Sequence, residues 1–161
     1  MPKFSVLTSI RIAPDPNTRE DKIDRFLACM QSLKDQTFRN FEWVLVDDGS
    51  TAEFDWDQVF KDIPSVNLVK KDHGERVIAL NIALKVSKGD WITFLDADDE
   101  IKPNALERMN FRIEDNPNYK MFNFGAVYAH QDNIFTFREP FAPKRKKVGH
   151  EIFGGGNIPS G

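Results

Sequence analysis

Short apolar runs alternate with segments of helical periodicity along residues 4–115 of the chain. The apolar runs predict strands over Phe4–Ile10, Phe41–Val46, Val66–Lys70 and Trp91–Leu95. The segments between and after them predict helices over residues 20–36, 54–61, 75–87 and 103–114. Strands that alternate with helices in this way are typical of parallel βαβ units, in which helices cover both faces of one sheet.

Three residues in or near the predicted helices carry expectations of their own. Apolar residues nearly encircle the helix over 75–87, which predicts that it is buried on all sides. Asn81 lies within this helix and therefore needs a polar partner, which we place in the loop after the second strand. Gly89 is predicted to cap the same helix at its C-terminal end. Pro103 is predicted to begin the last helix, because proline suits the first turn.

A different pattern begins after Asn118. Apolar residues over 121–129 and 134–137 predict two strands that form a hairpin around Asp132. A loop with basic residues at 144–147 and a glycine-rich end follow. The predicted fold class is therefore α/β: a Rossmann-like three-layer α/β/α sandwich with a mainly parallel sheet and a C-terminal β-hairpin.

Composition narrows the function. The 161 residues suit a single domain, and a net charge of -3 gives no reason to expect nucleic-acid binding. The sequence has no apolar run long enough for a transmembrane helix and no signal-peptide pattern at its start, which predicts a cytoplasmic protein that can also lie against the inner face of the membrane. Cys29 is the only cysteine and lies in an apolar run, so we expect a buried structural thiol.

Pairs of aspartates follow two of the predicted strands. Asp47 and Asp48 come after the second strand, and Asp96 and Asp98 come after the fourth. In open α/β sheets, ligands bind beyond the carboxyl ends of the strands. Two acidic strand ends in one sheet would repel each other, and a divalent cation such as Mg²⁺ or Mn²⁺ is the simplest way to offset that repulsion.

The spacing of Asp96 and Asp98 adds a second expectation. Where a chain turns at a strand's exit, residues two apart can point the same way, so one acid can bind a metal while the other meets a sugar or ribose hydroxyl. A turn rich in helix-capping aspartates is the alternative for an isolated pair. The buried strand before the pair, the proline-started helix after it and the matching Asp47 and Asp48 favour the functional interpretation.

These motifs occur in a familiar order. Residues 41–51 read FEWVLVDDGST, Gly74 precedes ALNIAL at 79–84, and residues 89–99 read GDWITFLDADD. In order and spacing, the chain from Phe4 to about residue 107 resembles the GT-A domain of family 2 glycosyltransferases. The resemblance implies transfer of a sugar from a nucleotide-diphosphate sugar, commonly a UDP-sugar, to a carbohydrate or lipid-linked acceptor, with inversion and with Mn²⁺ or Mg²⁺ as cofactor.

The resemblance also implies roles for residues at the nucleotide end of the site. Thr8 stands where the family contacts the nucleotide, and Asp47 or Asp48 would bind the base. Arg76 matches a position that helps to hold the base or the diphosphate. Structural alternatives stay open at this point: Thr8 can be an ordinary strand residue, and Arg76 a solvated residue at a helix start. His73 can line the pocket or be a loop residue without a role.

At the sugar end, the resemblance implies that Asp96 contacts the ribose or the sugar. Asp98 would bind the metal that bridges the two phosphates. The basic residues at 144–147 can meet an anionic acceptor or a lipid surface, or form a solvated loop. Strand 1 departs from the family, because Ser9–Ile12 replaces a proline-aromatic-asparagine stretch, and this departure weakens the role carried over to Thr8.

Inverting transfer needs a general base to deprotonate the acceptor hydroxyl. In this family an acidic residue late in the domain takes that role. The acids that follow Asp115 are Asp132, Glu139 and Glu151. None lies in the family's motif, so we assign no base. We therefore expect a partial GT-A domain, with nucleotide-sugar-binding units over 1–115 and the start of an acceptor-side region over 116–161.

Two other classes of protein compete with this interpretation. A nucleotidyltransferase usually has a glycine-rich basic loop after its first strand, and the corresponding loop here, Arg11–Asn17, contains no glycine. A non-catalytic module that holds a nucleotide-sugar, or an inactive fragment without the general base, is the alternative that the unassigned base favours. Metal-dependent donor binding without turnover would distinguish such a module from an enzyme.

Overall fold

The computed structural model describes residues 1–13, 15, 19–51, 55–122, 127–130 and 133–137. The chain divides into two compact units, Met1–Arg108 and Met109–Gly161. Within the described residues, no helix is both long enough and apolar enough to cross a bilayer.

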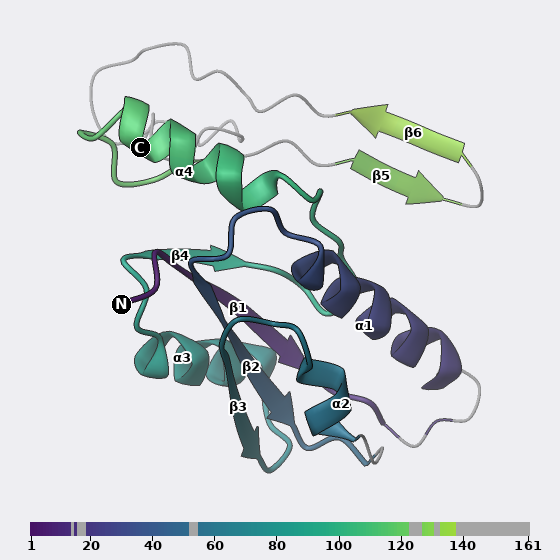
Figure 1. Ribbon diagram of the computed structural model, residues 1–161. Helices are drawn as coiled ribbons and strands as arrows, with labels where there is room; N and C mark the ends of the chain where they lie inside the picture. Colours follow the sequence, from purple (N-terminus) through teal and green to yellow (C-terminus); the bar gives the residue numbers. More distant parts are fainter. Residues whose placement is uncertain (14, 16–18, 52–54, 123–126, 131–132, 138–161) are drawn as a thin grey trace, which may run out of the picture. The chain divides into compact units, whose positions relative to one another are not determined.

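The first unit contains one parallel sheet with the strand order β3-β2-β1-β4 (Figure 1). Its strands are β1 (Phe4–Ile10), β2 (Phe41–Asp48), β3 (Val66–Lys71) and β4 (Trp91–Phe94). Its helices are α1 (Arg19–Lys34), α2 (Trp56–Phe60), α3 (Arg76–Val86) and the start of α4 (Ala105–Asp115). The four predicted strands and the α/β class are confirmed, and each helix begins and ends close to its predicted bounds.

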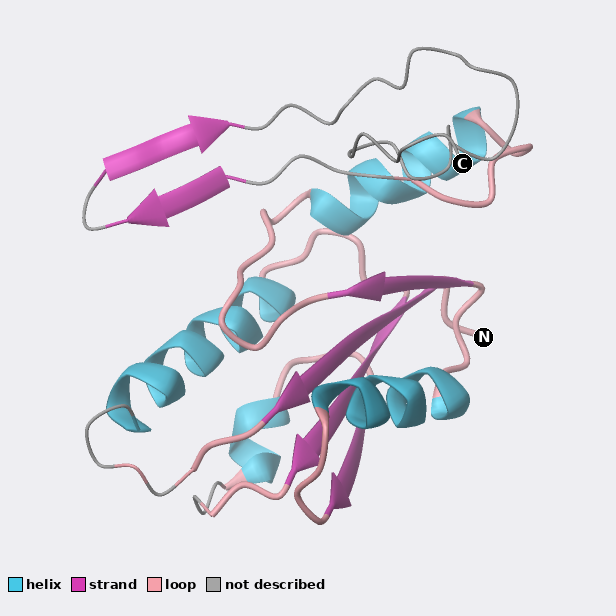
Figure 2. Cartoon of the chain, turned by 180° about the vertical axis from the view of Figure 1, so that it is seen from behind, coloured by secondary structure: helices cyan, strands magenta, loops and turns pink. Residues whose placement is uncertain are grey.

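Helices cover both faces of this sheet, with α1 and α2 on one face and α3 on the other (Figures 1 and 2). On the first face, the Trp43 ring packs 5.9 Å from the Phe26 ring of α1 and 5.7 Å from the Phe60 ring of α2, measured between centroids. On the second face, Ala79 and Ala83 of α3 pack in a core cluster with Leu7, Val44 and Val46. The period-two alternation of a strand therefore sends odd and even residues of β2 into different cores.

The burial of α3 differs from the prediction. Ala79 and Ala83 are fully buried, but Val77, Ile78 and Leu84 expose 63%, 49% and 48% of their surface. Asn81 is also exposed, so the buried polar partner predicted for it is not needed. Only one stripe of the helix meets the sheet, because a cylinder on a flat surface contacts it along a single line. Apolar residues show which surface of a helix can be buried, but the elements that pack against the helix determine how much of that surface is buried.

Gly89 does not cap α3. The helix ends at Val86, and its C-cap is Ser87, whose N–H donates to the Leu84 carbonyl oxygen. Gly89 instead lies against the start of β1, where its N–H donates to Ser5 Oγ at 2.8 Å. A Cβ on Gly89 would lie 2.5 Å from the Ser5 nitrogen and 2.6 Å from the Phe4 carbonyl carbon. The position therefore requires glycine for close approach of two backbones.

The start of α4 also differs by two residues from the prediction. Pro103 lies in a turn, and its carbonyl oxygen accepts from the Thr37 N–H at 2.8 Å. The buried Gln36 side chain then accepts from the Leu106 N–H at 3.1 Å. This side chain satisfies one of the unpaired N–H groups that every helix start presents, and it comes from a residue far away in the sequence.

Two short strands, β5 (Val127–His130) and β6 (Asn133–Phe137), pair antiparallel in the second unit. Met121 and Phe122 form no strand, so the predicted strand over 121–129 is wrong at its start. Residues 123–126 and 131–132 lie outside the described residues, so the hairpin turn around Asp132 stays a prediction. The basic residues at 144–147 and the glycine-rich end also lie outside the described residues.

We predict that Gly89→Ala lowers the free energy of unfolding by about 1–3 kcal/mol, because the added methyl group meets backbone atoms that cannot turn aside. Gly74→Ala is the comparison variant, since the atoms nearest to its Cβ belong to the side chains of Lys71, at 3.0 Å, and Asp48, at 3.9 Å, and not to backbone. Urea denaturation of both variants checks the prediction. Equal stabilities for the two variants would contradict the role in close packing given to Gly89.

Candidate functional site

The carboxyl ends of β1, β2 and β4 meet at one edge of the sheet. In the strand register, Ile10 pairs with Asp47, and the Leu95 N–H donates to the Leu7 carbonyl oxygen at 3.0 Å. The acidic residues after β2 and β4 therefore leave the sheet on either side of β1. This is the edge where open α/β sheets bind ligands.

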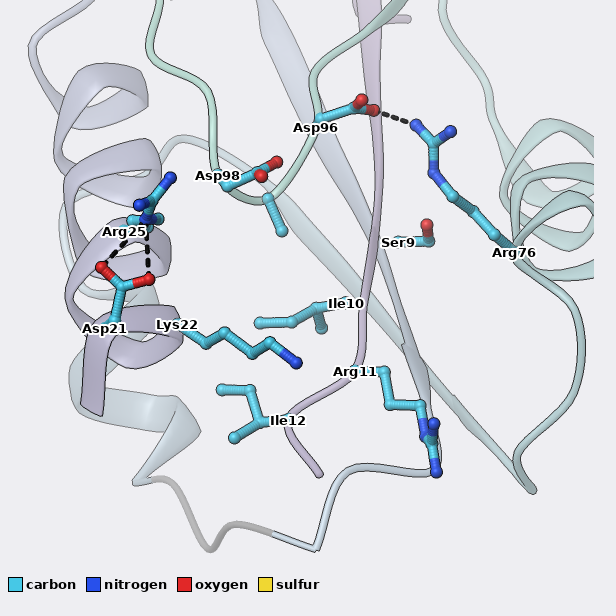
Figure 3. A pocket seen from close by; sticks show the side chains of 11 residues that line it. Ser9, Ile10, Arg11, Ile12, Asp21, Lys22, Arg25, Arg76, Asp96 and Asp98 are labelled. Carbon is cyan, nitrogen blue, oxygen red and sulfur yellow. Dashed lines mark hydrogen bonds and ion pairs between the residues drawn. The ribbon is translucent and has the colours of Figure 1, made fainter. Parts of the chain in front are cut away.

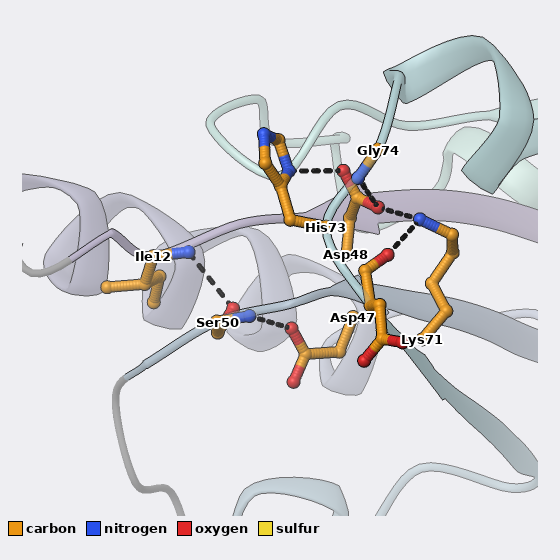
Figure 4. Close-up of polar contacts among 8 residues, drawn as sticks. Ile12, Asp47, Asp48, Ser50, Lys71, His73 and Gly74 are labelled. Atoms are coloured by element: carbon orange, nitrogen blue, oxygen red, sulfur yellow. Dashed lines mark hydrogen bonds and ion pairs between the residues drawn. The ribbon is translucent and has the colours of Figure 1, made fainter.

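Asp47 organises the loops at the strand exits. One of its carboxylate oxygens accepts from the Ser50 N–H at 2.9 Å. Ser50 in turn accepts from the Ile12 N–H through its hydroxyl oxygen at 3.0 Å (Figure 4). The Thr51 N–H donates to the Ile12 carbonyl oxygen at 3.0 Å. These bonds join the chain after β1 to the loop after β2. They hold one wall of the site in place.

Asp48 is the centre of a second, more tightly bonded cluster. Only 5% of its surface is exposed, and its carboxylate accepts from the Lys71 amino group and from the Gly74 N–H at 3.0 Å. The Nδ1 atom of His73 lies 3.2 Å from its other oxygen (Figure 4). Burial acts to raise the pKa of Asp48, but the bonds from Lys71, His73 and Gly74 outweigh it and hold the pKa below its ordinary value.

This cluster corrects the expectation for His73. The sequence left it either as a pocket residue or as a loop residue without a role, and the structure gives it a contact to Asp48 instead. It does not line the pocket described below. Together with Lys71 and Gly74, it ties the loop before α3 to the end of β2. Asp48 therefore determines where α3 begins.

A pocket of about 380 Å³ opens at the same edge of the sheet (Figure 3). Its walls are the end of β1 and the two residues after it (Ser9–Ile12), the first turns of α1, Arg76 at the start of α3 and Asp96–Asp98 after β4. Three of the six residues predicted for the site, Arg76, Asp96 and Asp98, thus lie together.

The other three predicted residues do not line this pocket. Thr8 is fully buried, and its hydroxyl oxygen accepts from the Trp43 indole N–H at 2.9 Å, which is the contact of an ordinary strand residue. Asp47 and Asp48 lie beside the pocket and shape the loops around it. Nucleotide contacts by Thr8, Asp47 and Asp48 stay predictions.

Sequence reasoning missed the contribution of α1. Asp21, Lys22 and Arg25 lie in its first turns and line the pocket opposite Arg76. Their spacing of three to four residues places charges on one side of a helix, which is a usable signal. The same spacing also occurs on helix faces that only contact solvent, so the sequence alone does not identify these residues as part of a site.

Opposite charges pair within the pocket. The Arg25 Nε atom lies 3.0 Å from the Asp21 carboxylate, and Arg76 pairs with Asp96. Among the described residues, Lys22 and Asp98 form no ion pair (Figure 3). Arg11 also lines the pocket and forms no ion pair among the described residues, so one carboxylate and two cationic groups remain available to a ligand.

The residues present fit a divalent ion that shares its ligands with a substrate. Within the described residues, no three histidine, cysteine, aspartate or glutamate side chains are grouped closely enough to hold a metal by themselves. Asp96 and Asp98 supply hard carboxylate oxygens, and ions of the magnesium type take one or two carboxylates and complete their shell with phosphates and water. Burial, followed by the charges of Asp98 and Asp96, raises the pKa of Asp99, as expected for crowded carboxylates.

Cys29 lies beneath this acidic loop and is fully buried, as predicted. Its thiol lies 3.5 Å from the Asp96 carbonyl oxygen, to which it donates. Burial, together with the charges of nearby acids, raises the pKa of the Cys29 thiol to about 12. The thiol is therefore a structural group and not a nucleophile at neutral pH.

Comparison with known proteins identifies the class. A model of the family described as glycosyl transferase family 2 matches residues 17–159. The chain belongs to this family.

Curated relatives agree with this membership. An uncharacterized glycosyltransferase of Haemophilus influenzae is 31% identical over 118 residues, which cover 73% of this chain and 40% of the relative. The UDP-Glc:alpha-D-GlcNAc-diphosphoundecaprenol beta-1,3-glucosyltransferase WfaP of Escherichia coli is 30% identical over 115 residues, covering 70% of this chain and 45% of WfaP. The matched region thus spans less than half of each of these relatives.

Solved structures share the fold. Residues 1–349 of TarS from S. aureus match with a TM-score of 0.62 at 23% identity, covering 80% of this chain and 38% of that one. Structures of the same TarS segment in complex with UDP and with UDP-GlcNAc match with TM-scores of 0.62 and 0.60. The parallel sheet with its flanking helices is therefore the GT-A fold expected from the sequence.

We predict that Asp48→Asn lowers the free energy of unfolding at pH 7 by about 1–3 kcal/mol, because it weakens three bonds to one buried group. The folded pKa of Asp48 lies below the ordinary value of 3.8, so its contribution is present above that value and is lost as the pH falls through the folded pKa. The difference in the free energy of unfolding between Asp48→Asn and the wild type should therefore become smaller at acidic pH. Denaturation curves at several pH values measure it.

Asp90→Asn is the control for this experiment, because Asp90 is exposed and forms no side-chain ion pair among the described residues. A difference between Asp48→Asn and wild type that does not change with pH would show that the charge of Asp48 is not what holds the cluster.

Proposed function

We propose that this pocket binds the diphosphate and sugar of a nucleotide-sugar donor, and that the protein transfers the sugar to an acceptor with inversion. One observation carries the proposal: Arg76, Asp96 and Asp98 line a single pocket at the carboxyl edge of a parallel sheet. The cation suits a diphosphate, and the carboxylates suit a divalent ion and sugar hydroxyls. Membership of glycosyl transferase family 2 supports a transferase.

The charges in the pocket support a donor that binds together with a metal. Four cationic side chains and three carboxylates line it, so the lining is close to neutral. A diphosphate ester carries about two negative charges, which a divalent ion balances. The lining carries about one net positive charge, which the metal and diphosphate together leave unchanged, whereas a divalent ion that enters alone raises it to about three.

The chemistry divides between the metal and the chain. A divalent ion at Asp98 would stabilise the leaving nucleoside diphosphate as a Lewis acid. Arg76 and Lys22 would hold the phosphates, and Asp96 would orient the ribose or sugar. We assign no residue as the general base that deprotonates the acceptor hydroxyl.

Relatives make a UDP-sugar the first donor to test. The name of WfaP specifies UDP-Glc as donor and a lipid-linked diphosphate sugar as acceptor. TarS, which shares the fold, has been crystallised with UDP and with UDP-GlcNAc. We therefore propose a UDP-sugar donor and a carbohydrate or lipid-linked acceptor. Release of UDP from UDP-sugars would separate an enzyme from a module that only binds the donor.

We predict that UDP binds more tightly in the presence of Mn²⁺, and that Asp98→Ala removes this metal dependence. The affinity of the variant for UDP in Mn²⁺ should fall at least about tenfold, since even indirect metal partners contribute that much. Isothermal titration calorimetry with and without Mn²⁺ measures the effect. Glu100→Gln is the control, because Glu100 is an exposed acid nearby that does not line the pocket. Metal-dependent binding that survives in Asp98→Ala would refute the role given to Asp98.

We also predict that Lys22→Ala weakens UDP binding about three- to tenfold but leaves uridine binding unchanged, because a charged hydrogen bond to a phosphate is lost. Lys34→Ala, in the last turn of the same helix, removes an equal charge outside the pocket and should have no effect. Calorimetric titrations with both ligands check this. Equal losses for UDP and uridine would show that Lys22 does not contact the phosphates.

A further inference from the structure

At each of the two acidic strand ends, a basic side chain of the protein already pairs with an aspartate. Lys71 pairs with Asp48 at the end of β2, and Arg76 pairs with Asp96 after β4. Lys71 and Arg76 thus offset part of the repulsion between the acidic strand ends, whereas Asp98 forms no ion pair among the described residues.

The two pairs differ in how freely they can separate. The Lys71 and Asp48 side chains expose only 17% and 7% of their surface, whereas Arg76 and Asp96 expose 60% and 45%. A pair in contact with solvent is weakly held, because water and salt screen it. Arg76 can therefore leave its partner at little cost, and Lys71 cannot.

The backbone beneath Arg76 is fixed although its side chain is free. The Gly74 N–H donates to Asp48, and the Ile78 N–H donates to the Glu75 carbonyl oxygen at 2.9 Å, so the first turn of α3 is anchored on both sides of Arg76. Exchange of its partner therefore needs only rotation of the side chain within the pocket.

We propose that Arg76 is an exchangeable counter-ion, which occupies Asp96 in the free protein and moves to the diphosphate when the donor binds. This inference rests on the proposed function. A divalent ion that enters alone meets the guanidinium beside Asp96 and is repelled. When the ion arrives with a diphosphate, Arg76 moves to the phosphates and Asp96 becomes free. The exchange makes metal and nucleotide bind as a pair.

The test measures Mn²⁺ binding without nucleotide, from the electron paramagnetic resonance signal of free Mn²⁺. Arg76→Ala should bind Mn²⁺ about two- to fivefold more tightly than wild type, which is the range of an exposed ion pair. With Mn²⁺ saturating, the same variant should bind UDP about tenfold more weakly, because a charged contact to the diphosphate is lost. Opposite changes in the two affinities are the signature of exchange.

Two further variants serve as controls. Lys85→Ala removes a positive charge from the last turn of the same helix and should change neither affinity. Arg76→Lys retains the charge and should bind Mn²⁺ as weakly as the wild type does. This variant also keeps the proposal testable if Arg76→Ala does not fold. Circular dichroism establishes that each variant is folded.

Unchanged or weaker Mn²⁺ binding in Arg76→Ala would overturn the counter-ion role, and so would unchanged UDP binding. Failure of this role is distinguishable from failure of the proposed function. If Asp98→Ala abolishes metal-dependent UDP binding while Arg76→Ala leaves Mn²⁺ binding unchanged, the donor site stands and the exchange does not. If the wild type binds no UDP under any condition, both fail.

Discussion

The position of β1 between β2 and β4 is the constraint on which the rest of the structure depends. All three strands run parallel, so their carboxyl ends lie at one edge and the loops that follow them become neighbours. The nearly complete burial of β1 makes this arrangement costly to change, since a slip of one residue would turn every apolar side chain to the wrong face. The pocket at that edge is a consequence of this packing, and its lining comes from four separate stretches of the chain.

Polar contacts then convert the strand edge into a defined site. The alternation of β2 directs Asp47 and Asp48 to opposite faces, and each binds a different loop. Asp47 holds the chain after β1 through Ser50, while Asp48 holds the start of α3 through Gly74. Both aspartates thus contribute to the site as anchors of its walls. This explains how two such acidic residues can be almost fully buried, because each has hydrogen-bond donors around it.

The site combines a rigid frame with movable charges. Backbone positions at the pocket wall are held by buried bonds, whereas the side chains of Arg76 and Asp96 remain accessible to solvent. Such a division suits a site that must accept a charged ligand and release it, since partners that are weakly held in water exchange readily. The exposed apolar face of α3 lies outside this frame and takes no part in it.

The sequence by itself determined the order of strands and helices, the α/β class and the acidic exits of β2 and β4. These features follow from local patterns, namely apolar runs, helical periodicity and aspartates directly after strands. Tertiary structure alone decided that α1 shares the pocket with Arg76, because α1 and α3 reach it from opposite faces of the sheet. It also decided that Gly89 meets another backbone and that Gln36 receives the first turn of α4. Such contacts join residues distant in sequence, and only the packed chain brings them together.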